Sequence, residues 1–258
     1  MELIVIGAGP AYTDRRGAAA SSYLLRGGGA ALLLDLGQGA FSNLASEIEP
    51  SALTAVLVSH LHPDHFVDLV PLRHYLKWEF DPPRRARVLG PAGLADRLDA
   101  LNGHPGFAAA SIDVETLSEG VQRFEPFEVE ARRVAHAGES YAFRVTSRSG
   151  AGVAAGEDGR GPGLVYSGDC AHAEDLLPLI HPGDTVLSEA SFGAGPIAPG
   201  AQHITSGEVA RVASAGGAAR LLLTHVLSGP SREETLAAAK AEFAGPVQLV
   251  TEGDRFQV

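Results

Sequence analysis

Cysteine is almost absent from the sequence, because Cys170 is the only one among 258 residues. A single cysteine excludes an internal disulfide and is typical of proteins from a reducing compartment. The segment that begins at Met1 has no basic region and no cleavage pattern, and it continues at once into an aliphatic run, unlike a secretory signal. We therefore expect a cytoplasmic protein.

Long hydrophobic runs are also lacking. The longest runs, such as residues 30–34 and 221–223, are far shorter than the roughly 20 apolar residues that a membrane-spanning helix needs. The sequence therefore predicts no membrane-spanning helix and no membrane partner.

The sequence has no excess of basic residues. The sequence contains 20 Lys and Arg residues and 31 Asp and Glu residues, so its formal net charge is −11. A surface that binds long nucleic acids needs a basic face, because its affinity comes from neutralised phosphates. Two short basic clusters, residues 84–87 and 132–133, are local exceptions. Such clusters usually form a solvated surface, so a long nucleic acid is the weaker expectation.

Short aliphatic segments bounded by glycine alternate with amphipathic stretches along the chain. They predict strands at residues 3–6, 22–25, 31–35, 54–59, 87–89, 112–117, 127–135, 141–147, 164–167, 185–188, 220–224 and 247–250. Helices are expected at residues 41–48, 68–80, 91–101 and 173–180, and after the capping pairs Thr205/Glu208 and Ser231/Glu234.

The order of these segments suggests the architecture. The segments between residues 112 and 147 are expected to form an antiparallel meander, and the glycine-rich residues 150–163 to form a mobile hairpin tip. No linker and no short-period repeat divides the chain. The prediction is a single domain over residues 1–258 of the α/β (α+β) class, with two facing sheets and helices outside.

Three histidines and one aspartate occupy six residues directly after the apolar run 55–58, at His60, His62, Asp64 and His65. Three imidazoles at one strand end would repel one another when protonated, and each would need its own partner. Neutral imidazole and carboxylate are the usual ligands of zinc, and manganese and iron are also compatible. We expect these side chains to lie in a loop, where they can face two separate cations.

This spacing resembles the His-x-His-x-Asp-His signature of the metallo-β-lactamase superfamily, whose fold is a four-layer αββα sandwich. The resemblance implies that His60 and His62 bind one metal and that Asp64 and His65 bind a second. It also implies three further ligands, each at a strand end. They are His136 for the first metal, Asp169 as the bridging residue and His225 for the second metal.

Two cations suit hydrolysis. When they lie roughly 3.5 to 4 Å apart they can activate a water molecule and stabilise both the attacking and the leaving oxygen. Asp64, beside the second metal, is a candidate for accepting a proton or orienting the nucleophile. The departing alkoxide then needs a general acid.

Residues 189–192 and 203–205 look like the Glu-Ala-Thr-Phe and His-Ser-Thr segments of the ribonuclease Z branch of this superfamily. The resemblance implies that His203 donates a proton to the leaving group or binds a phosphate oxygen. Glu189 is expected to orient a histidine through a hydrogen bond. The alternative is that His203 is a surface residue beside a capped helix start.

The likeness covers nearly the whole chain and extends to small phosphodiesterases of this branch that hydrolyse cyclic nucleotides and lack a tRNA-gripping arm. Residues 150–163 form the only insertion and carry two acids and a single Arg160. We therefore expect a small phosphodiester substrate such as a cyclic nucleotide. The resemblance also implies a homodimer. The alternatives are tRNA 3′-end processing, hydrolysis of a lactone, thioester or β-lactam, and non-catalytic binding.

Overall fold

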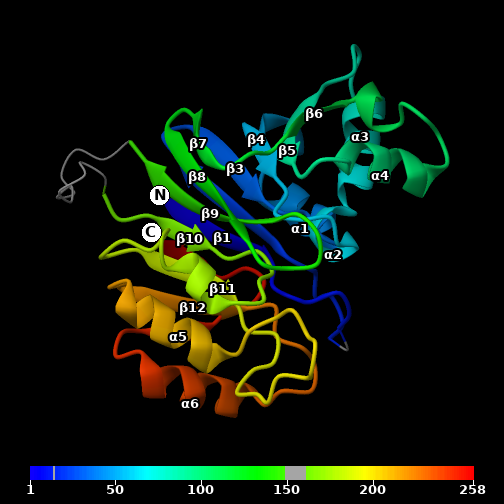
Figure 1. Cartoon of the computed structure of the whole chain (residues 1–258). Helices are drawn as coiled ribbons and strands as arrows, with labels where there is room; N and C mark the ends of the chain where they lie inside the picture. The colour runs from blue at the N-terminus through cyan, green and yellow to red at the C-terminus, as the bar shows by residue number, and fades with distance from the viewer. Residues whose placement is uncertain (14, 149–160) are drawn as a thin grey trace.

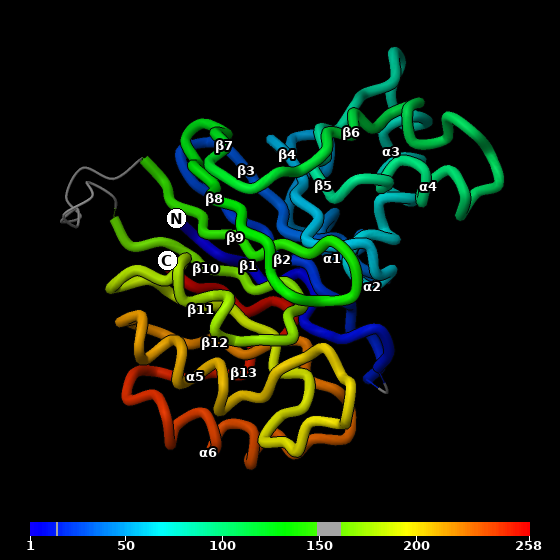
Figure 2. Tube along the Cα trace, in the orientation of Figure 1, coloured from blue at the N-terminus to red at the C-terminus, as the bar shows by residue number. Residues whose placement is uncertain are grey.

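Two mixed seven-stranded sheets face each other, with helices on their outer sides (Figure 1). The computed structural model describes residues 1–13, 15–148 and 161–258. The predicted αββα sandwich is confirmed by this arrangement. The chain ends meet on the first sheet, where the amino group of Met1 donates a hydrogen bond to the carbonyl of Val258 at 2.8 Å (Figure 2).

The first sheet has the strand order β14-β1-β2-β3-β4-β5-β6. Its strands are β1 (Glu2–Gly7), β2 (Ser22–Gly27), β3 (Ala30–Leu34), β4 (Ala55–Leu57), β5 (Ala86–Gly90), β6 (Ile112–Thr116) and β14 (Arg255–Gln257). The helical segments between them are α1 (Ala40–Glu47), η1 (Pro50–Ala52), α2 (Pro63–Phe66), α3 (Leu69–Trp78), α4 (Leu94–Asn102) and η2 (Ala108–Ala110). Strands β3 to β6 run parallel.

The second sheet has the order β13-β12-β11-β10-β9-β8-β7. Its strands are β7 (Gly120–Phe124), β8 (Phe127–Val134), β9 (Ser140–Ser147), β10 (Leu164–Tyr166), β11 (Thr185–Glu189), β12 (Arg220–Thr224) and β13 (Val247–Leu249). Its helical segments are η3 (Ala173–Leu176), α5 (Ser206–Ala215) and α6 (Arg232–Glu242). Strands β10 to β13 run parallel.

Three apolar layers hold the sandwich together, and the side chains of β1 contribute to two of them. Leu3 and Val5 point into the layer between the sheets, whereas Ile4 and Ile6 point into the layer beneath α1, α3 and α4. A third layer joins the second sheet to α5 and α6. Because both faces of the central strands are covered, these strands read as continuous apolar runs in the sequence rather than as alternating ones.

The two expected helix caps differ. Thr205 accepts a hydrogen bond from the backbone N–H of Glu208, whose side chain accepts one from the backbone of Thr205, so α5 begins with a complete capping box. At α6, the Ser231 hydroxyl accepts from the N–H of Glu234. The capping residues therefore start both helices where the sequence places them.

Several expectations about the elements are wrong. Residues 112–117 do not join the meander, because β6 pairs in parallel with β5 in the first sheet; the meander is β7-β8-β9. Residues 173–180 form only the short 3₁₀ turn η3 instead of a helix. Strands β7 and β14 were not predicted, since their short segments are partly exposed and mixed in polarity.

The glycine-rich segment cannot be compared with its prediction, since residues 149–160 lie outside the described residues. The strands on either side of it, β9 and β10, are antiparallel neighbours. Within the described part of the chain, no helix combines the length and the apolar character that crossing a membrane requires.

Candidate metal centre

The candidate ligands gather at one edge of the two sheets because they follow the ends of neighbouring strands. The His60–His65 segment follows β4 after a short extended stretch, and His225 directly follows β12. His136 lies two residues beyond β8, and Asp169 three residues beyond β10. The structure brings all seven residues predicted as ligands into this one region.

The seven residues form two groups that share one member. In each group the ligand atoms lie within 4.8 Å of one another. The first group contains His60, His62, His136 and Asp169, and the second contains Asp64, His65, Asp169 and His225. Their composition, imidazole and carboxylate, is suited to binding metal ions.

A single helical turn divides the six-residue motif between the groups. Pro63 occupies the first position of α2, where its fixed φ and missing N–H are tolerated. The N–H of His65 donates to the carbonyl of His62 at 3.0 Å. Asp64 and His65 therefore lie on a helical turn rather than in the expected loop. The rings of His60 and His65 stay close, with centroids 4.1 Å apart, so the two groups are neighbours.

Asp169 stands between the two groups. Its Oδ1 lies 3.3 Å from Nε2 of His65, and its Oδ2 lies 3.7 Å from Nε2 of His60. Three buried atoms of these ligands have no hydrogen-bond partner among the described residues: His60 Nε2, His65 Nε2 and Asp169 Oδ1. Buried polar atoms without partners are rare, because desolvation is costly. Atoms that face a common centre and lack protein partners fit a bound cation.

Outer hydrogen bonds orient the imidazole rings. His136 Nδ1 donates to the carbonyl of Gln202 at 2.8 Å. Ser191 donates its own hydroxyl proton to Glu189, so its oxygen accepts from Nδ1 of His225 at 3.0 Å. In each case the partner places a proton on Nδ1, so Nε2 faces the centre and can supply the lone pair that metal ligation requires.

Asp35 holds the second group from outside. Its carboxylate accepts hydrogen bonds from Nδ1 of His65, from the backbone and hydroxyl of Ser59, and from the hydroxyl of Tyr166. The residue is fully buried and has a φ of 57°. A non-glycine residue in this region is uncommon and occurs where the surroundings impose it.

His203 lies beside the two groups rather than on a remote surface. Its Nδ1 is 3.0 Å from Glu189 Oε1 and 3.8 Å from Asp169 Oδ2, and about a quarter of its side chain is exposed. The ring centroid is 5.2 Å from that of His136. The hydrogen bond expected between Glu189 and a histidine is present, and it leaves Nε2 of His203 available to a substrate.

The buried histidines of the two groups do not share one pKa shift. Burial would lower the pKa values of His65 and His225, but the charge of Asp169 and further carboxylate contacts outweigh it and raise both. Burial lowers the pKa of His60 well below its usual value, and the neighbouring His65 lowers it further. Burial would raise the pKa of Asp169, but the charges of His225 and His65 outweigh it and hold that pKa well below its usual range. A neutral imidazole and an ionised carboxylate are the forms that bind metals, so a cation at the second group would displace protons from His65 and His225.

Sequence reasoning missed the residues that orient the ligands. Asp35 was predicted only as the last residue of a strand, and Ser59, Tyr166 and Ser191 were given no role. A polar residue directly after a buried strand was the available signal for Asp35 and Ser59. Tyr166 carries no such signal, because it lies inside an apolar strand.

An open cleft of about 390 Å³ begins at the centre. Its lining residues come from the segments after β4, β5 and β8, and they are Leu61, His62, Pro91, Ala92, Arg97, Ala137, Gly138 and Glu139. Because His62 belongs both to this cleft and to the first ligand group, the cleft lies next to the centre.

Comparison with known proteins places this geometry in a family. The profile of the beta-lactamase superfamily domain matches residues 32–226. An uncharacterized protein of Mycobacterium leprae is 35% identical over 250 residues, which cover 93% of this chain and 82% of that protein. The probable metallo-hydrolase YhfI of Bacillus subtilis is 27% identical over 245 residues, 91% of each chain. A ribonuclease Z of Salinispora arenicola is 28% identical over 296 residues, 97% of this chain and 94% of that enzyme.

Solved structures share the fold. The crystal structure of YhfI from Bacillus subtilis superposes with a TM-score of 0.85 at 24% identity and covers 99% of both chains. The human short-form tRNase Z superposes with a TM-score of 0.73 at 22% identity and covers 100% of this chain and 99% of that one. From the profile match, the relatives and the ligand groups together, we conclude that the chain belongs to the beta-lactamase superfamily, as a metallo-hydrolase of its ribonuclease Z-like branch.

Proposed function

We propose that the protein is a dinuclear metal-dependent phosphodiesterase that hydrolyses a small phosphodiester such as a cyclic nucleotide. The observation that carries this proposal is that Asp169 is shared by two complete ligand groups. His60, His62 and His136 would hold one cation, and Asp64, His65 and His225 the other. We propose zinc as the metal, because nitrogen-rich sites of this composition suit it.

Bound divalent cations would supply an activated water and would neutralise charge on the phosphoryl oxygens. The chain's own residues would do the rest. Asp64 would orient the attacking oxygen. His203, held at Nδ1 by Glu189, would keep a proton at Nε2 for the departing alkoxide.

His203 is equipped to hold that proton. Burial alone would lower its pKa, but the hydrogen bond and the charge of Glu189 outweigh burial, and the pKa is raised above its usual value. The ring is also partly exposed, so a substrate can reach it. A protonated imidazole beside the ligand groups supports phosphodiester cleavage over hydrolysis of a lactone or thioester.

Three observations support a small substrate. The cleft beside His62 is about 390 Å³, and the net charge of the chain is −11. The basic cluster at residues 84–87 is largely neutralised, because Arg85 pairs with Asp113 and Arg87 with Glu115. These arginines are therefore poorly placed to neutralise the phosphates of a long nucleic acid.

The test is a substrate screen with zinc-loaded protein on cyclic AMP, cyclic GMP and bis(p-nitrophenyl) phosphate. We expect turnover of at least one of them, with loss of both metal and activity in Asp169→Ala. Failure to hydrolyse any of the three by a protein that retains its metal would overturn the proposal.

Processing of tRNA is the second candidate, and the likeness to a ribonuclease Z favours it. A cleavage assay with precursor tRNA separates the two. Release of the 3′ trailer at a rate far above the turnover of cyclic nucleotides would replace the first proposal with the second. Parallel assays with a lactone, a thioester and a β-lactam test the remaining substrate classes of this fold.

A further inference from the structure

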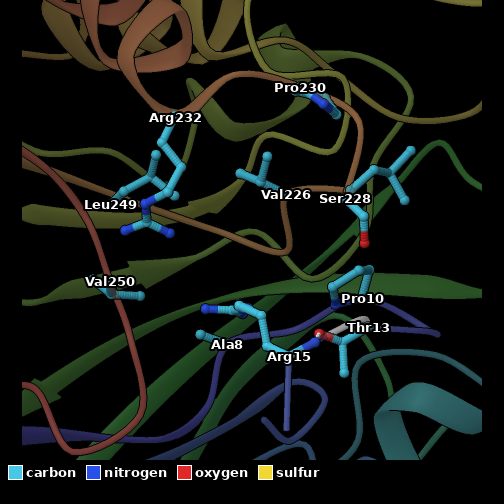
Figure 3. A pocket seen from close by; sticks show the side chains of 11 residues that line it. Ala8, Pro10, Thr13, Arg15, Val226, Ser228, Pro230, Arg232, Leu249 and Val250 are labelled. Atoms are coloured by element: carbon cyan, nitrogen blue, oxygen red, sulfur yellow. Dashed lines mark hydrogen bonds between the residues drawn. The ribbon is translucent and has the colours of Figure 1, made fainter.

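A pocket of about 110 Å³ lies between two loops that follow strands of different sheets. Ala8, Pro10, Thr13 and Arg15, from the loop after β1, supply one wall, and residues 226–228, 230 and 232, after β12, supply the other. Figure 3 shows the side chain of Arg232 descending from the upper wall and that of Arg15 extending from the lower wall. The two guanidinium groups therefore approach the same space from opposite sides.

Neither guanidinium is neutralised by a described residue. Within residues 1–13, 15–148 and 161–258, neither Arg15 nor Arg232 forms an ion pair, and neither side chain forms a hydrogen bond. Arg85 and Arg87 differ in this respect, since each makes several hydrogen bonds to one carboxylate. Two arginines without an ion-pair partner among the described residues therefore line one pocket of a chain whose net charge is −11.

The remaining walls combine two hydroxyl groups with apolar surface. Thr13 and Ser228 carry the hydroxyls, and the oxygen of Ser228 points down toward Pro10 and Thr13 (Figure 3). The apolar residues are Ala8, Pro10, Val226, Leu227, Pro230, Leu249 and Val250. Apolar walls lower the local dielectric, so a charged hydrogen bond inside the pocket is stronger than one on an open surface.

The pocket adjoins the metal centre through the backbone. The N–H of His225 donates to the carbonyl of Ala8 at 3.0 Å, which joins the two loops at their bases. Val226 and Leu227 line the pocket and directly follow His225. Because consecutive Cα atoms are about 3.8 Å apart, the wall of the pocket begins within one or two residues of a candidate ligand.

We propose that this Arg15/Arg232 pocket binds a phosphate monoester dianion. Arginine is the side chain best matched to phosphate, because its planar fork can donate two parallel hydrogen bonds. A cavity of about 150 Å³ can hold benzene, so about 110 Å³ accommodates one phosphate group but not a nucleoside. The phosphate is either a terminal group of the substrate or a free anion.

In the first case the proposal rests on the proposed function and narrows it. The substrate would carry a terminal phosphate in addition to the phosphodiester that is cleaved at the metals. A linear dinucleotide with a 5′-phosphate has this chemistry. In the second case the pocket is an anion site beside the centre, independent of which bond the centre hydrolyses.

The first arm of the test compares two dinucleotides that share one phosphodiester, one with a 5′-phosphate and one with a 5′-hydroxyl. For the metal-loaded protein we expect kcat/KM to be about tenfold higher for the phosphorylated dinucleotide, as a charge-assisted hydrogen bond provides. Arg15→Gln and Arg232→Gln should each bring the ratio toward 1. Lys240→Gln removes the same charge from α6 outside the pocket, and it should keep the wild-type ratio.

The second arm titrates inorganic phosphate into the metal-loaded protein and follows the heat of binding. A phosphate site that disappears in the Arg15→Gln/Arg232→Gln double variant, without a dinucleotide preference, assigns the pocket to a free anion. A dinucleotide ratio near 1 in the wild type, together with identical titrations for the wild type and the double variant, overturns the proposal. So does a preference that both arginine variants retain.

The two proposals can fail separately. Hydrolysis of bis(p-nitrophenyl) phosphate reports on the metal centre and needs no second phosphate. If that activity is absent, the phosphodiesterase proposal fails, and the phosphate titration still decides whether the Arg15/Arg232 pocket binds an anion.

Discussion

Nδ1 of His65 donates a hydrogen bond of 2.7 Å to the carboxylate of Asp35, and both side chains are fully buried. The same carboxylate accepts from the hydroxyl of Tyr166, which belongs to the opposite sheet. One acid therefore fixes the tautomer of a candidate ligand and links the two halves of the sandwich at the edge where the ligands meet.

Asp35→Asn tests this relationship. The amide cannot accept all of these hydrogen bonds, so the ring of His65 loses its fixed orientation. We expect the affinity for zinc to fall by about 10- to 100-fold, the range seen when such outer partners of metal ligands are changed. Competition with a chelator measures it. Asp113→Asn removes an exposed carboxylate paired with Arg85 and should leave the affinity unchanged; an equal loss in both variants would contradict the role of Asp35.

Removal of metal is expected to lower stability. His60 Nε2, His65 Nε2 and Asp169 Oδ1 are buried without hydrogen-bond partners in the described part of the chain, so a bound cation compensates a desolvation cost that the chain otherwise bears. At a free metal concentration 100 times the Kd, binding stabilises the fold by about 2.7 kcal/mol. Thermal unfolding with and without a chelator should show a lower Tm after chelation and recovery with added zinc. An unchanged Tm in a protein shown to have lost its metal would argue against the site.

Two histidine variants should separate metal binding from proton transfer. His62→Ala removes a member of the first ligand group and should lose metal together with activity. His203→Ala should keep the metal, since its ring is held by Glu189, while kcat for a poor leaving group falls by about 10²- to 10⁴-fold. Metal analysis and kinetics on the same samples decide it, and loss of metal from His203→Ala would make His203 a ligand instead.

The pH profile should depend on Glu189. His203 has a raised pKa, and its donor function is complete below that pKa and is lost as the pH rises through it. Glu189→Gln removes the charge that outweighs burial, so the alkaline limb of the kcat profile should move to lower pH. Glu242→Gln, which changes an exposed acid paired with Arg211, serves as the control. A limb that stays in place in Glu189→Gln would assign the proton donor to another group.

Gly37 should be essential for the position of α2. A Cβ at this residue would lie 1.9 Å from the backbone oxygen of Asp64, so the turn that carries Asp64 and His65 must move. We expect Gly37→Ala to lower both the Tm and the affinity for zinc. At Gly207, on α5, an added Cβ would lie 3.9 Å from the nearest atom. The control Gly207→Ala should therefore be neutral or stabilise the fold by up to about 1 kcal/mol. Equal Tm and zinc affinity in the two variants would show that the close approach at Gly37 is not required.

Local patterns determined much of this protein in advance. Apolar runs between glycines marked most of the strands, and paired capping residues marked the starts of α5 and α6, because these signals depend on neighbours within a few residues. The cluster from His60 to His65 predicted a metal site for the same reason, because all four side chains lie within six residues of one another. The sequence did not predict which strand β6 pairs with. It placed residues 112–117 in the meander of the second sheet, whereas β6 pairs with β5 in the first.

The tertiary structure decided how the ligands are grouped and what supports them. Asp64 and His225 are 161 residues apart in the chain, yet Nε2 of His225 lies 3.1 Å from Oδ2 of Asp64. Only the packing of the two sheets against each other produces this contact. The same closing brings Tyr166 to Asp35 and sets Arg15 opposite Arg232. No local pattern carries this information, because each pair belongs to strands or loops whose neighbours are chosen by packing across the whole sandwich.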